Sequence, residues 1–377
     1  MPNKKRIGFL SYWNWGRGQS YVTLGFVKML LPKYEVFVFN NGKENCLENT
    51  KHGFKEFTDI EKNGPVKVTQ LDDYHVPPEV FKKWIKDNKL DAVIFNEYQQ
   101  WSESKDNLVD VANECGVKTY GYLVWERFQD ETVFNYDRIF APTVSFERFL
   151  RKNKVRNFTY VPYSVDLKGE FPDPTKTKVK KDTGKFTFFH PGGWGGVHQR
   201  KNSEAVFNAF LMLNRADTKL IMTSQTPISD EIKKIAENAT GEIEIIDKEL
   251  TREELINYYY ISDVTVLPSK WETIGIPILE ALASGTPVIT SNMPPMNEFV
   301  RPGLNGYVTE GLPRKWPDIT VTGIEVDITK LKINMENIMS PYLFNLLSKN
   351  ARIISEDIYD LEKNKHYLLD FLKEDLK

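Results

Sequence analysis

The sequence predicts an α/β fold with two successive domains, each built on a parallel β-sheet that helices cover on both faces. Short apolar runs alternate with amphipathic helical patterns along most of the 377 residues. This is the order expected of parallel strands and their crossover helices. A polar stretch at 168–184, with two prolines and a lysine cluster, interrupts the alternation once. The length also fits two domains at about 150 residues each.

The first half contains six apolar runs typical of buried strands: 6–10, 35–40, 91–96, 118–124, 138–142 and 158–163. Amphipathic patterns of helical period lie between some of them, at 21–31, 79–88 and 144–153. Continuous apolar strands of this kind are typical of sheets buried on both faces. We therefore expect residues 1–167 to form the first α/β domain, followed by a linker at 168–184.

The alternation resumes after the linker. Five further runs are predicted strands: 186–192, 219–224, 242–247, 263–268 and 287–291. Four helical patterns separate them, at 203–214, 229–238, 252–260 and 277–284. We expect a second α/β domain at 185–340. The tail, 341–377, carries Leu and Ile at helical spacing, which predicts a helix that packs on the body of the protein.

Composition excludes several classes of protein. Lys and Arg number 50 against 52 Asp and Glu, so the chain lacks the basic excess of a nucleic-acid binder. The two cysteines, Cys46 and Cys115, form no CxxC pair, and no window approaches 18 apolar residues. The five histidines have no zinc-binding spacing and no D-x-D pair occurs. We expect a cytoplasmic protein with no bound metal and no organic cofactor.

One segment, 263–291, reads strand, loop, helix, strand. Pro277 suits the first helical turn, and Gly285 suits the position after the helix ends. The helix therefore begins where a strand ends, and its first backbone N–H groups are an anion site suited to phosphate. These N–H groups belong to the residues around Thr273, Ile274 and Gly275.

Two carboxylates flank this helix start, Glu272 in the loop and Glu280 farther along the helix. Carboxylates in such places can accept hydrogen bonds from sugar or ribose hydroxyls. The alternative is that Glu272 is a cap-like acid and Glu280 a solvated helix residue. Their spacing alone leaves both interpretations open.

Two glycine-rich loops follow other predicted strands. In FFHPGGWGGVHQRKN (188–202), Arg200 and Lys201 come directly before the next helix, where paired cations suit a diphosphate. His190 and His198 are more typical of loop or core histidines than of ligands or bases. In SYWNWGRGQS (11–20), the glycines do not complete the GxGxxG fingerprint of dinucleotide binding. Trp13 and Trp15 either stack on a sugar ring or cover this loop, and we favour the second.

With these residues in view, the segment 261–308 resembles the retaining nucleotide-sugar-dependent glycosyltransferases of group 1, which have the GT-B fold. Glu272 and Glu280 match the E-x7-E signature of that family, and the 188–202 loop is similar to its G…RK donor loop. VPYSVD (161–166) is similar to the segment that leads into the family's linker. The resemblance is strong over about 155–310 and weak over the first 150 residues.

The resemblance implies two Rossmann-like domains that face each other across a cleft, with the C-terminal helix crossing back to pack on the N-terminal, acceptor-side domain. It implies that Arg200 and Lys201 bind the donor's diphosphate. Glu280 would bind the ribose hydroxyls. Glu272 would hold the hydroxyls of the donor sugar near the reacting carbon, and the N–H groups of 273–275 would assist.

Four further residues take roles by comparison with the same family. A loop containing Gly16 and Gly18 would close over the diphosphate from the first domain, and the nucleoside would lie near Ile246. Many relatives carry a histidine after the strand that matches 118–124, but here the segment reads Val-Trp-Glu-Arg. Glu126 is the candidate in its place, as a carboxylate that accepts the proton of the acceptor hydroxyl. The alternative is that Glu126 pairs with Arg127 or another surface cation.

The predicted function is transfer of a hexose from a nucleotide diphosphate sugar to an acceptor hydroxyl (on a glycan, a lipid or another molecule), with retention and without a metal. The alternatives on the same fold are a sugar-nucleotide epimerase, a phosphorylase, and a non-catalytic subunit that binds sugar nucleotide. Phe146, Phe149 and Leu150 lie among five basic residues at 148–156. They predict either a peripheral membrane contact or, as we favour, an ordinary amphipathic helix with a basic solvated end.

Overall fold

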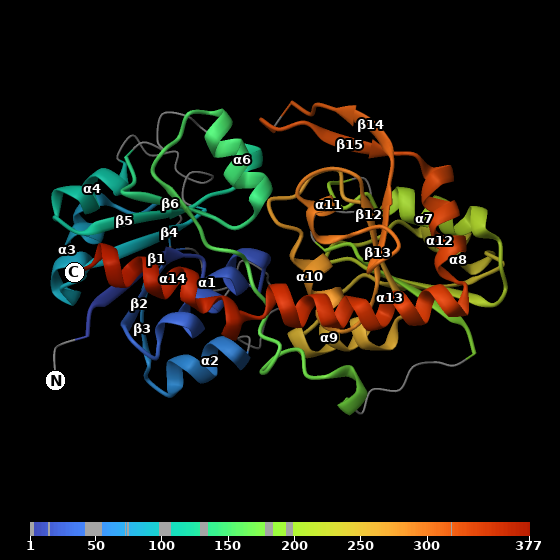
Figure 1. Ribbon diagram of the computed structural model, residues 1–377, viewed down its shortest axis with the longest axis horizontal. Coiled ribbons are helices and arrows are strands. Elements are labelled where there is room, and N and C mark those ends of the chain that lie inside the picture. Colours follow the sequence, from blue (N-terminus) through green and yellow to red (C-terminus); the bar gives the residue numbers. More distant parts are fainter. Residues whose placement is uncertain are drawn as a thin grey trace. The chain divides into compact units, whose positions relative to one another are not determined.

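The computed structural model describes residues 4–13, 16–41, 55–71, 73, 75–97, 107–128, 135–177, 184–193, 199–317 and 319–377. The chain divides into two compact units (Figure 1). The first unit comprises Met1–Tyr163 together with Leu361–Lys377, and the second comprises Ser164–Asp360.

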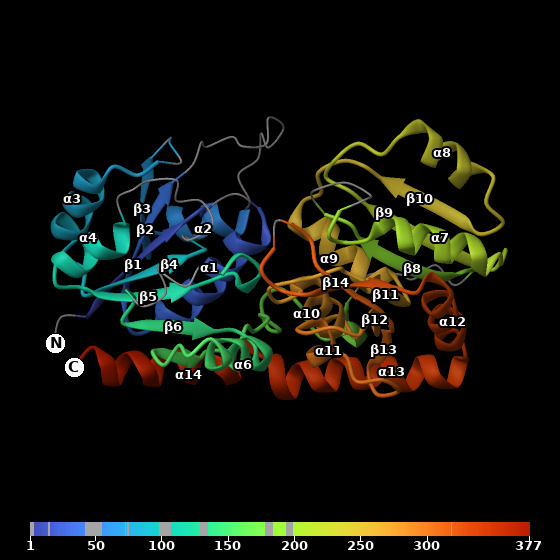
Figure 2. The same ribbon diagram turned by 90° about the horizontal axis from the view of Figure 1, so that it is seen from above.

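The first unit is built on a parallel sheet in the order β3-β2-β1-β4-β5-β6-β7. Its strands are β1 (Arg6–Ser11), β2 (Glu35–Asn41), β3 (Val66–Leu71), β4 (Ala92–Asn96), β5 (Lys118–Tyr122), β6 (Arg138–Ala141) and β7 (Phe158–Tyr160). Its helices are α1 (Gly18–Leu30), α2 (Lys55–Lys62), α3 (Pro78–Asn88), α4 (Leu108–Glu114), α6 (Val144–Lys152) and α14 (Leu361–Asp375). Helices lie against both faces of the sheet (Figure 2).

The second unit contains a parallel sheet in the order β10-β9-β8-β11-β12-β13 and an antiparallel hairpin, β14-β15. The strands are β8 (Phe186–Pro191), β9 (Thr218–Thr223), β10 (Glu242–Ile246), β11 (Val264–Leu267), β12 (Val288–Ser291), β13 (Gly306–Thr309), β14 (Gly311–Arg314) and β15 (Gly323–Val326). The helices are α7 (Ser203–Leu213), α8 (Asp230–Glu237), α9 (Arg252–Ile261), α10 (Ile276–Ala283), α11 (Met296–Phe299), α12 (Ile328–Ile338) and α13 (Pro341–Ile354). The apolar faces of α7, α8, α12 and α13 share one core with β8, β9, β11, β12 and β15.

Both sheets reverse strand order at one point, between β1 and β4 in the first unit and between β8 and β11 in the second. In open α/β sheets, ligands bind outside the carboxyl ends of the strands at such a point. The predicted α/β fold class is therefore confirmed, and the sheet topology identifies where a site is expected in each unit.

The division of the chain differs from the expected boundaries in two places. The expected linker begins at residue 168, but residues 168–177 pack on the second unit: Phe171 is fully buried and the Tyr260 hydroxyl donates to the Pro172 carbonyl at 2.7 Å. The expected single tail helix is interrupted by a π-helical turn, Ser355–Tyr359, and by Asp360, whose backbone is extended. As a result, α13 belongs to the second unit and α14 alone belongs to the first.

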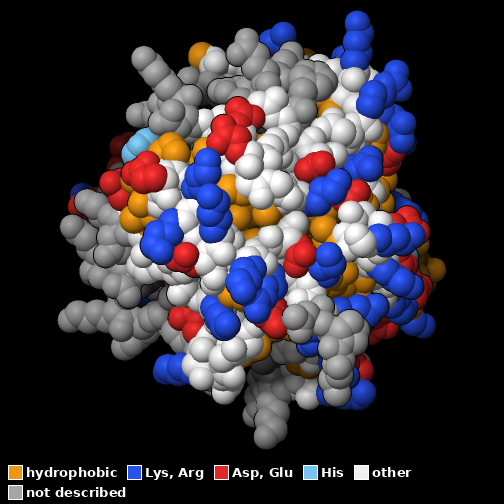
Figure 3. All heavy atoms as spheres, turned by 90° about the vertical axis from the view of Figure 1, so that its left-hand side faces the viewer, with side chains coloured by type: hydrophobic (Ala, Val, Ile, Leu, Met, Phe, Trp, Pro, Cys, Tyr) orange, Lys and Arg blue, Asp and Glu red, His pale blue; other side chains and the backbone are white. Residues whose placement is uncertain are grey.

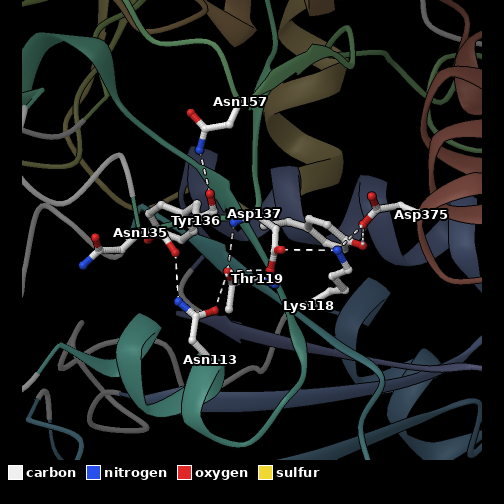
Figure 4. A network of polar contacts seen from close by, with 9 residues as sticks. Asn113, Lys118, Thr119, Asn135, Tyr136, Asp137, Asn157 and Asp375 are labelled. Atoms are coloured by element: carbon white, nitrogen blue, oxygen red, sulfur yellow. Dashed lines mark hydrogen bonds and ion pairs between the residues drawn. The ribbon is translucent and has the colours of Figure 1, made fainter.

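Polar and aromatic contacts hold α14 against the first unit. The Tyr120 hydroxyl donates to Asp375 at 2.8 Å, and Lys118 lies between Asp375 and Asp137 (Figure 4). The ring of Phe371 lies 5.4 Å from that of Tyr120. Burial and the neighbouring Asp375 carboxylate raise the pKa of Tyr120 well above its usual range. The hydroxyl therefore remains a donor at any physiological pH.

Helix length and surface charge bear on whether the protein has a membrane or polyanion partner. Among the described residues, no helix is long and apolar enough to cross a membrane. On the face drawn in Figure 3, Lys and Arg side chains are interspersed with Asp and Glu, with small hydrophobic areas between them. No single sign of charge dominates that face.

Candidate functional site

The carboxyl end of β8 leads into the predicted donor loop of the second unit. A Cβ atom at Gly192 would lie 2.4 Å from the carbonyl oxygen of Thr223, so only glycine allows β8 and β9 to approach here. Gly193 follows with φ +65°, a conformation that glycine adopts without strain. Residues 194–198, which include His198, lie outside the described residues.

His190 is a core histidine, as the sequence predicts. The side chain is fully buried, Nδ1 lies 2.8 Å from the Val266 carbonyl and Nε2 lies 2.7 Å from the Ser203 hydroxyl. A carbonyl can only accept, so Nδ1 carries the hydrogen and Nε2 accepts from Ser203. Burial lowers the pKa of His190 to about 4. The ring is therefore neutral near pH 7 and links β8, β11 and α7.

Glu272 lies at the centre of the site in the second unit. The carboxylate is buried and accepts hydrogen bonds from Arg200, from Lys201 Nζ at 2.6 Å and from the Ser269 hydroxyl at 2.8 Å. The Lys201 side chain is 11% exposed, whereas that of Arg200 is 37% exposed. The structure thus brings together three residues that the sequence placed in two separate motifs.

Two loops are hydrogen-bonded to each other to make this cluster. The backbone N–H of Lys270 donates to the Arg200 carbonyl at 2.8 Å. The side-chain amide of Asn202 donates to the Pro268 carbonyl at 3.2 Å. Asn202 itself has φ +58°, which turns the chain from the cationic pair directly into α7. The backbone therefore fixes both cations beside Glu272.

Burial and charge act against each other on these side chains. Burial by itself would raise the pKa of Glu272, but the charges of Arg200 and Lys201 outweigh it and lower that pKa below its usual value. Burial also lowers the pKa of Lys201, and Glu272 partly opposes that effect. Glu272 is consequently ionised near neutral pH.

Helix α10 begins at Ile276, four residues after Glu272, close to the predicted start at 277. Gly275 is its N-cap with φ +91°, and Pro277 lies in its first turn. N–H groups in the first turn of a helix have no carbonyl partner within the helix, so its start attracts anions. Thr273 is half-buried and Ile274 is buried. Glu272, which contacts both cations, therefore lies four residues before the first residue of α10.

Glu280 is not a solvated helix residue, so that alternative is wrong. Its side chain is 3% exposed and forms an ion pair with Arg252 at 2.6 Å. Its second oxygen accepts a hydrogen bond from the Tyr259 hydroxyl at 3.0 Å. Ile246, expected near the nucleoside, is the buried last residue of β10, in the strand before α9.

Sequence reasoning missed Ser269, Arg252 and Tyr259. Ser269 lies in the D-x-x-x-x-P-S segment before Glu272, so proximity along the chain was an available signal. Arg252 and Tyr259 come from α9, far from Glu280 along the chain, and no local pattern connects them. Among the described residues, no group of His, Cys, Asp and Glu side chains is suited to hold a metal ion.

In the first unit, the loop after β1 leads into α1. Gly16 has φ +62° and Gly18 is the first residue of the helix. Trp13 is fully buried against Phe57 and its indole N–H donates to Glu61, so this tryptophan covers the loop, as we favoured. Trp15 lies outside the described residues.

Glu126 lies in a 3₁₀ turn, Trp125–Arg127, that follows the carboxyl end of β5. The side chain is half-buried. Burial raises the pKa of the Tyr122 hydroxyl, and the nearby carboxylates of Glu97 and Glu126 raise it further. Glu126 therefore lies at the edge of the sheet where ligands are expected. Its role as a base stays a prediction.

The amphipathic helix α6 packs as an ordinary core helix. Phe146 and Leu150 are fully buried, and the Phe149 ring contacts those of Trp125 and Phe128 at 5.7 and 5.0 Å. The apolar side chains that a membrane contact would need are thus already used within the first unit.

Residues 178–312 match the family model described as "Glycosyl transferases group 1". This is the family that the sequence resembles. The match contains Arg200, Lys201, Glu272, Ser269 and Glu280, which are the residues of the site just described.

Curated relatives match over part of their length. The chain is 27% identical over 183 residues to alpha-monoglucosyldiacylglycerol synthase of Streptococcus pneumoniae, covering 48% of this chain and 40% of that protein. It is 29% identical over 103 residues to D-inositol 3-phosphate glycosyltransferase of Corynebacterium glutamicum, covering 27% and 25%. The matches thus span less than half the length of these curated relatives.

Solved structures match the whole fold. A glycosyltransferase from Rickettsia africae has a TM-score of 0.74 at 16% identity, covering 100% of this chain and 99% of that chain. HepE of Anabaena, solved in complex with UDP and glucose, has a TM-score of 0.70 at 13% identity, covering 98% and 100%. These likenesses confirm the GT-B fold that the sequence resemblance implies.

Proposed function

We propose that the chain transfers a hexose from a nucleoside diphosphate sugar to an acceptor hydroxyl, with retention of configuration at the anomeric carbon. The observation that carries this proposal is the cluster of Arg200, Lys201 and Glu272 beside the N-terminus of α10. Two cations against one carboxylate leave a net positive charge there. Such a charge at a helix N-terminus favours a doubly anionic diphosphate.

The comparisons support the proposal. The cluster lies inside the residues that match the group 1 family model. Both curated relatives cited above are named for glycosyl transfer, and one solved structure of the same fold holds UDP and glucose. We carry over from the resemblance that Glu280 binds ribose hydroxyls, that the nucleoside lies near Ile246, and that the Gly16–Gly18 loop closes over the diphosphate.

The chemistry follows from these assignments. The bond between the anomeric carbon and the diphosphate oxygen breaks, and its electron pair leaves with the diphosphate. Arg200, Lys201 and the α10 N–H groups stabilise that developing charge. The acceptor oxygen forms the new bond to the anomeric carbon, and its proton passes to a base, for which Glu126 is the candidate. Because protein cations balance the charge of the leaving group, we propose that turnover needs no metal ion.

Glu272 has two functions in this proposal. Without donor, it holds both cations in place, so the site is organised before the ligand arrives. With donor bound, one carboxylate oxygen is available for the hydroxyls of the transferred sugar while the diphosphate shares the cations. The cluster therefore binds the leaving group and positions the sugar.

A thermal-shift panel of UDP-, GDP-, ADP- and TDP-sugars tests the proposal first, because a ligand that binds only the folded state raises the melting temperature. The sugar nucleotide that stabilises most is then incubated without acceptor, with and without a chelator. Slow release of free sugar that the chelator does not abolish is the expected result.

Other outcomes identify the alternatives. Net epimerisation of the sugar nucleotide would indicate an epimerase, and sugar phosphate formed only with added phosphate would indicate a phosphorylase. Binding without turnover in the presence of glycan and lipid acceptors would indicate a non-catalytic subunit. No stabilisation by any member of the panel would overturn the proposal.

A further inference from the structure

The guanidinium group of Arg252 lies buried between two carboxylates. Arg252 is the first residue of α9, and its side chain is 6% exposed. One terminal nitrogen donates to Glu280 Oε1 at 2.6 Å, and the other donates to Glu170 Oε2 at 2.8 Å. The planar group also lies 5.5 Å from the ring centre of Phe171. Its position is therefore fixed by contacts on several sides.

Both oxygens of Glu280 are restrained. Oε1 accepts from Arg252, and Oε2 accepts from the Tyr259 hydroxyl at 3.0 Å. An ionised carboxylate offers about four lone-pair sites. The protein uses one on each oxygen, so each oxygen can still accept one hydrogen bond from a ligand.

The charges of Arg252, Glu170 and Glu280 sum to one negative charge. Arg252 carries one positive charge, and it is shared between Glu170 and Glu280. Arginine keeps its proton at all accessible pH values, so the positive charge between the two carboxylates is constant. A fixed carboxylate with surplus negative charge favours hydroxyl donors and disfavours phosphate oxygens.

We propose that Arg252 and Tyr259 are positioning residues, which orient the Glu280 carboxylate so that it accepts hydrogen bonds from both ribose hydroxyls of the donor. This inference rests on the proposed function, in which Glu280 binds the ribose. Arg252 also connects that carboxylate to Glu170, because it donates hydrogen bonds to both. Glu170 lies near the start of the second unit, which begins at Ser164. The orientation of Glu280 thus depends on contacts from α9 and from residues 164–171.

Two adjacent tyrosines provide a matched test. Tyr259 and Tyr260 are both buried, and each hydroxyl donates one hydrogen bond, the first to Glu280 and the second to the Pro172 carbonyl. Tyr259→Phe and Tyr260→Phe each remove one buried hydroxyl and its hydrogen bond, and the loss of stability should be larger at Tyr259, whose acceptor is charged. Only Tyr259→Phe removes a restraint on Glu280.

The quantity measured is the ratio of two affinities, that of a nucleoside diphosphate with its ribose hydroxyls and that of the same compound without them. The probe is whichever of UDP, GDP or ADP stabilises the protein most, compared with its 2′,3′-dideoxy analogue by calorimetry. Hydrogen bonds to a charged group predict that the unchanged protein prefers the ribose form by roughly 10- to 100-fold. Tyr259→Phe should lower this preference by at least about threefold, and Arg252→Met should bring it close to one. Arg252→Lys keeps the positive charge but lacks the planar guanidinium that donates to both carboxylates. Its ribose preference should lie between those of Tyr259→Phe and Arg252→Met.

Glu280→Gln separates two kinds of failure. If that variant keeps the full ribose preference, Glu280 does not bind the ribose, and both the proposed role and this inference fail. If Glu280→Gln loses the preference while Arg252→Met and Tyr259→Phe keep it, the role of Glu280 stands and the positioning inference is overturned. An equal loss in Tyr259→Phe and Tyr260→Phe would also overturn it, since the effect would then be general. The tyrosine pair still decides the matter if Arg252→Met does not fold.

Discussion

Replacement of Lys201 by Met tests how the donor site is stabilised. Lys201 Nζ lies 2.6 Å from Glu272, and the two side chains are 11% and 5% exposed. Removing one partner of a buried ion pair typically destabilises a protein by about 3–5 kcal/mol, because the other charge stays buried. Glu272 keeps Arg200 and Ser269 as partners, so we expect the lower end of that range.

The expected shift in melting temperature follows from the size of the second unit. For a unit of roughly 200 residues, 1 kcal/mol corresponds to about 2–4 °C. Lys201→Met should therefore lower the melting temperature by about 6–12 °C in a calorimetric scan. It should also weaken nucleoside diphosphate binding by roughly 10- to 150-fold, because a charge-assisted contact of about 1.5–3 kcal/mol is lost.

An exposed pair in the same unit is the control. Lys185 lies 2.8 Å from Glu242, but the side chains are 35% and 43% exposed. Lys185→Met should shift the melting temperature by only about 2 °C, since exposed pairs contribute under about 1 kcal/mol. The double variant with Met at Lys201 and Glu272 should recover stability relative to Lys201→Met, because no buried charge of that pair remains. A Lys201→Met protein that melts like the Lys185→Met control would refute the reasoning.

Two further predictions concern single residues in each unit. Glu126→Gln keeps the shape of the side chain but cannot take a proton, so turnover with saturating donor and acceptor should fall by about 10²–10⁴-fold; a fall of less than tenfold would limit Glu126 to positioning. His190 has its pKa lowered to about 4 in the folded protein, so below pH 6.5 the unfolded chain binds a proton that the folded chain does not. Stability should decrease as pH falls from about 6.5 to 4, by up to about 3 kcal/mol, and melting scans of His190→Asn should lack this part of the pH dependence.

Burial decides which elements the sequence could predict. Strands such as β4 and β11, buried along their whole length, appear as continuous apolar runs and were predicted at nearly their observed positions. Strand β3, VKVTQL, is half-buried or exposed after its first residue, and β14, GLPR, is mostly exposed. Such edge and hairpin strands carry no continuous apolar run, so they were missed. Their hydrogen bonds depend on neighbours that the local sequence does not reveal.

The same distinction applies to the site. Glu272, Glu280, Arg200 and Lys201 could be chosen from spacing beside predicted strand ends, where the position of a motif along the chain implies its position in the fold. The pairing of Glu272 with both cations could not be chosen in that way, because it depends on the hydrogen bond between the loops at Lys270 and Arg200. The contacts of Glu280 with Arg252 and Tyr259 could not be predicted either, because these residues lie on another helix, α9.

The two glutamates of the signature have different charged neighbours, and this difference leads to a final prediction. Glu272 faces two cations, whereas Glu280 shares one arginine with Glu170. Glu272→Gln removes the carboxylate that competes with a diphosphate for Arg200 and Lys201. Free nucleoside diphosphate should therefore bind this variant at least as tightly as it binds the unchanged protein.

The turnover rate of Glu272→Gln, in contrast, should fall. A glutamine at 272 cannot hold the transferred sugar with a charged acceptor, so the rate should fall by at least about tenfold, as expected when one charge-assisted hydrogen bond is lost. Calorimetry with the free diphosphate and a rate assay on the same preparation measure both effects. A tenfold loss of diphosphate affinity in Glu272→Gln would mean that the carboxylate chiefly organises the two cations and does not compete with the ligand for them.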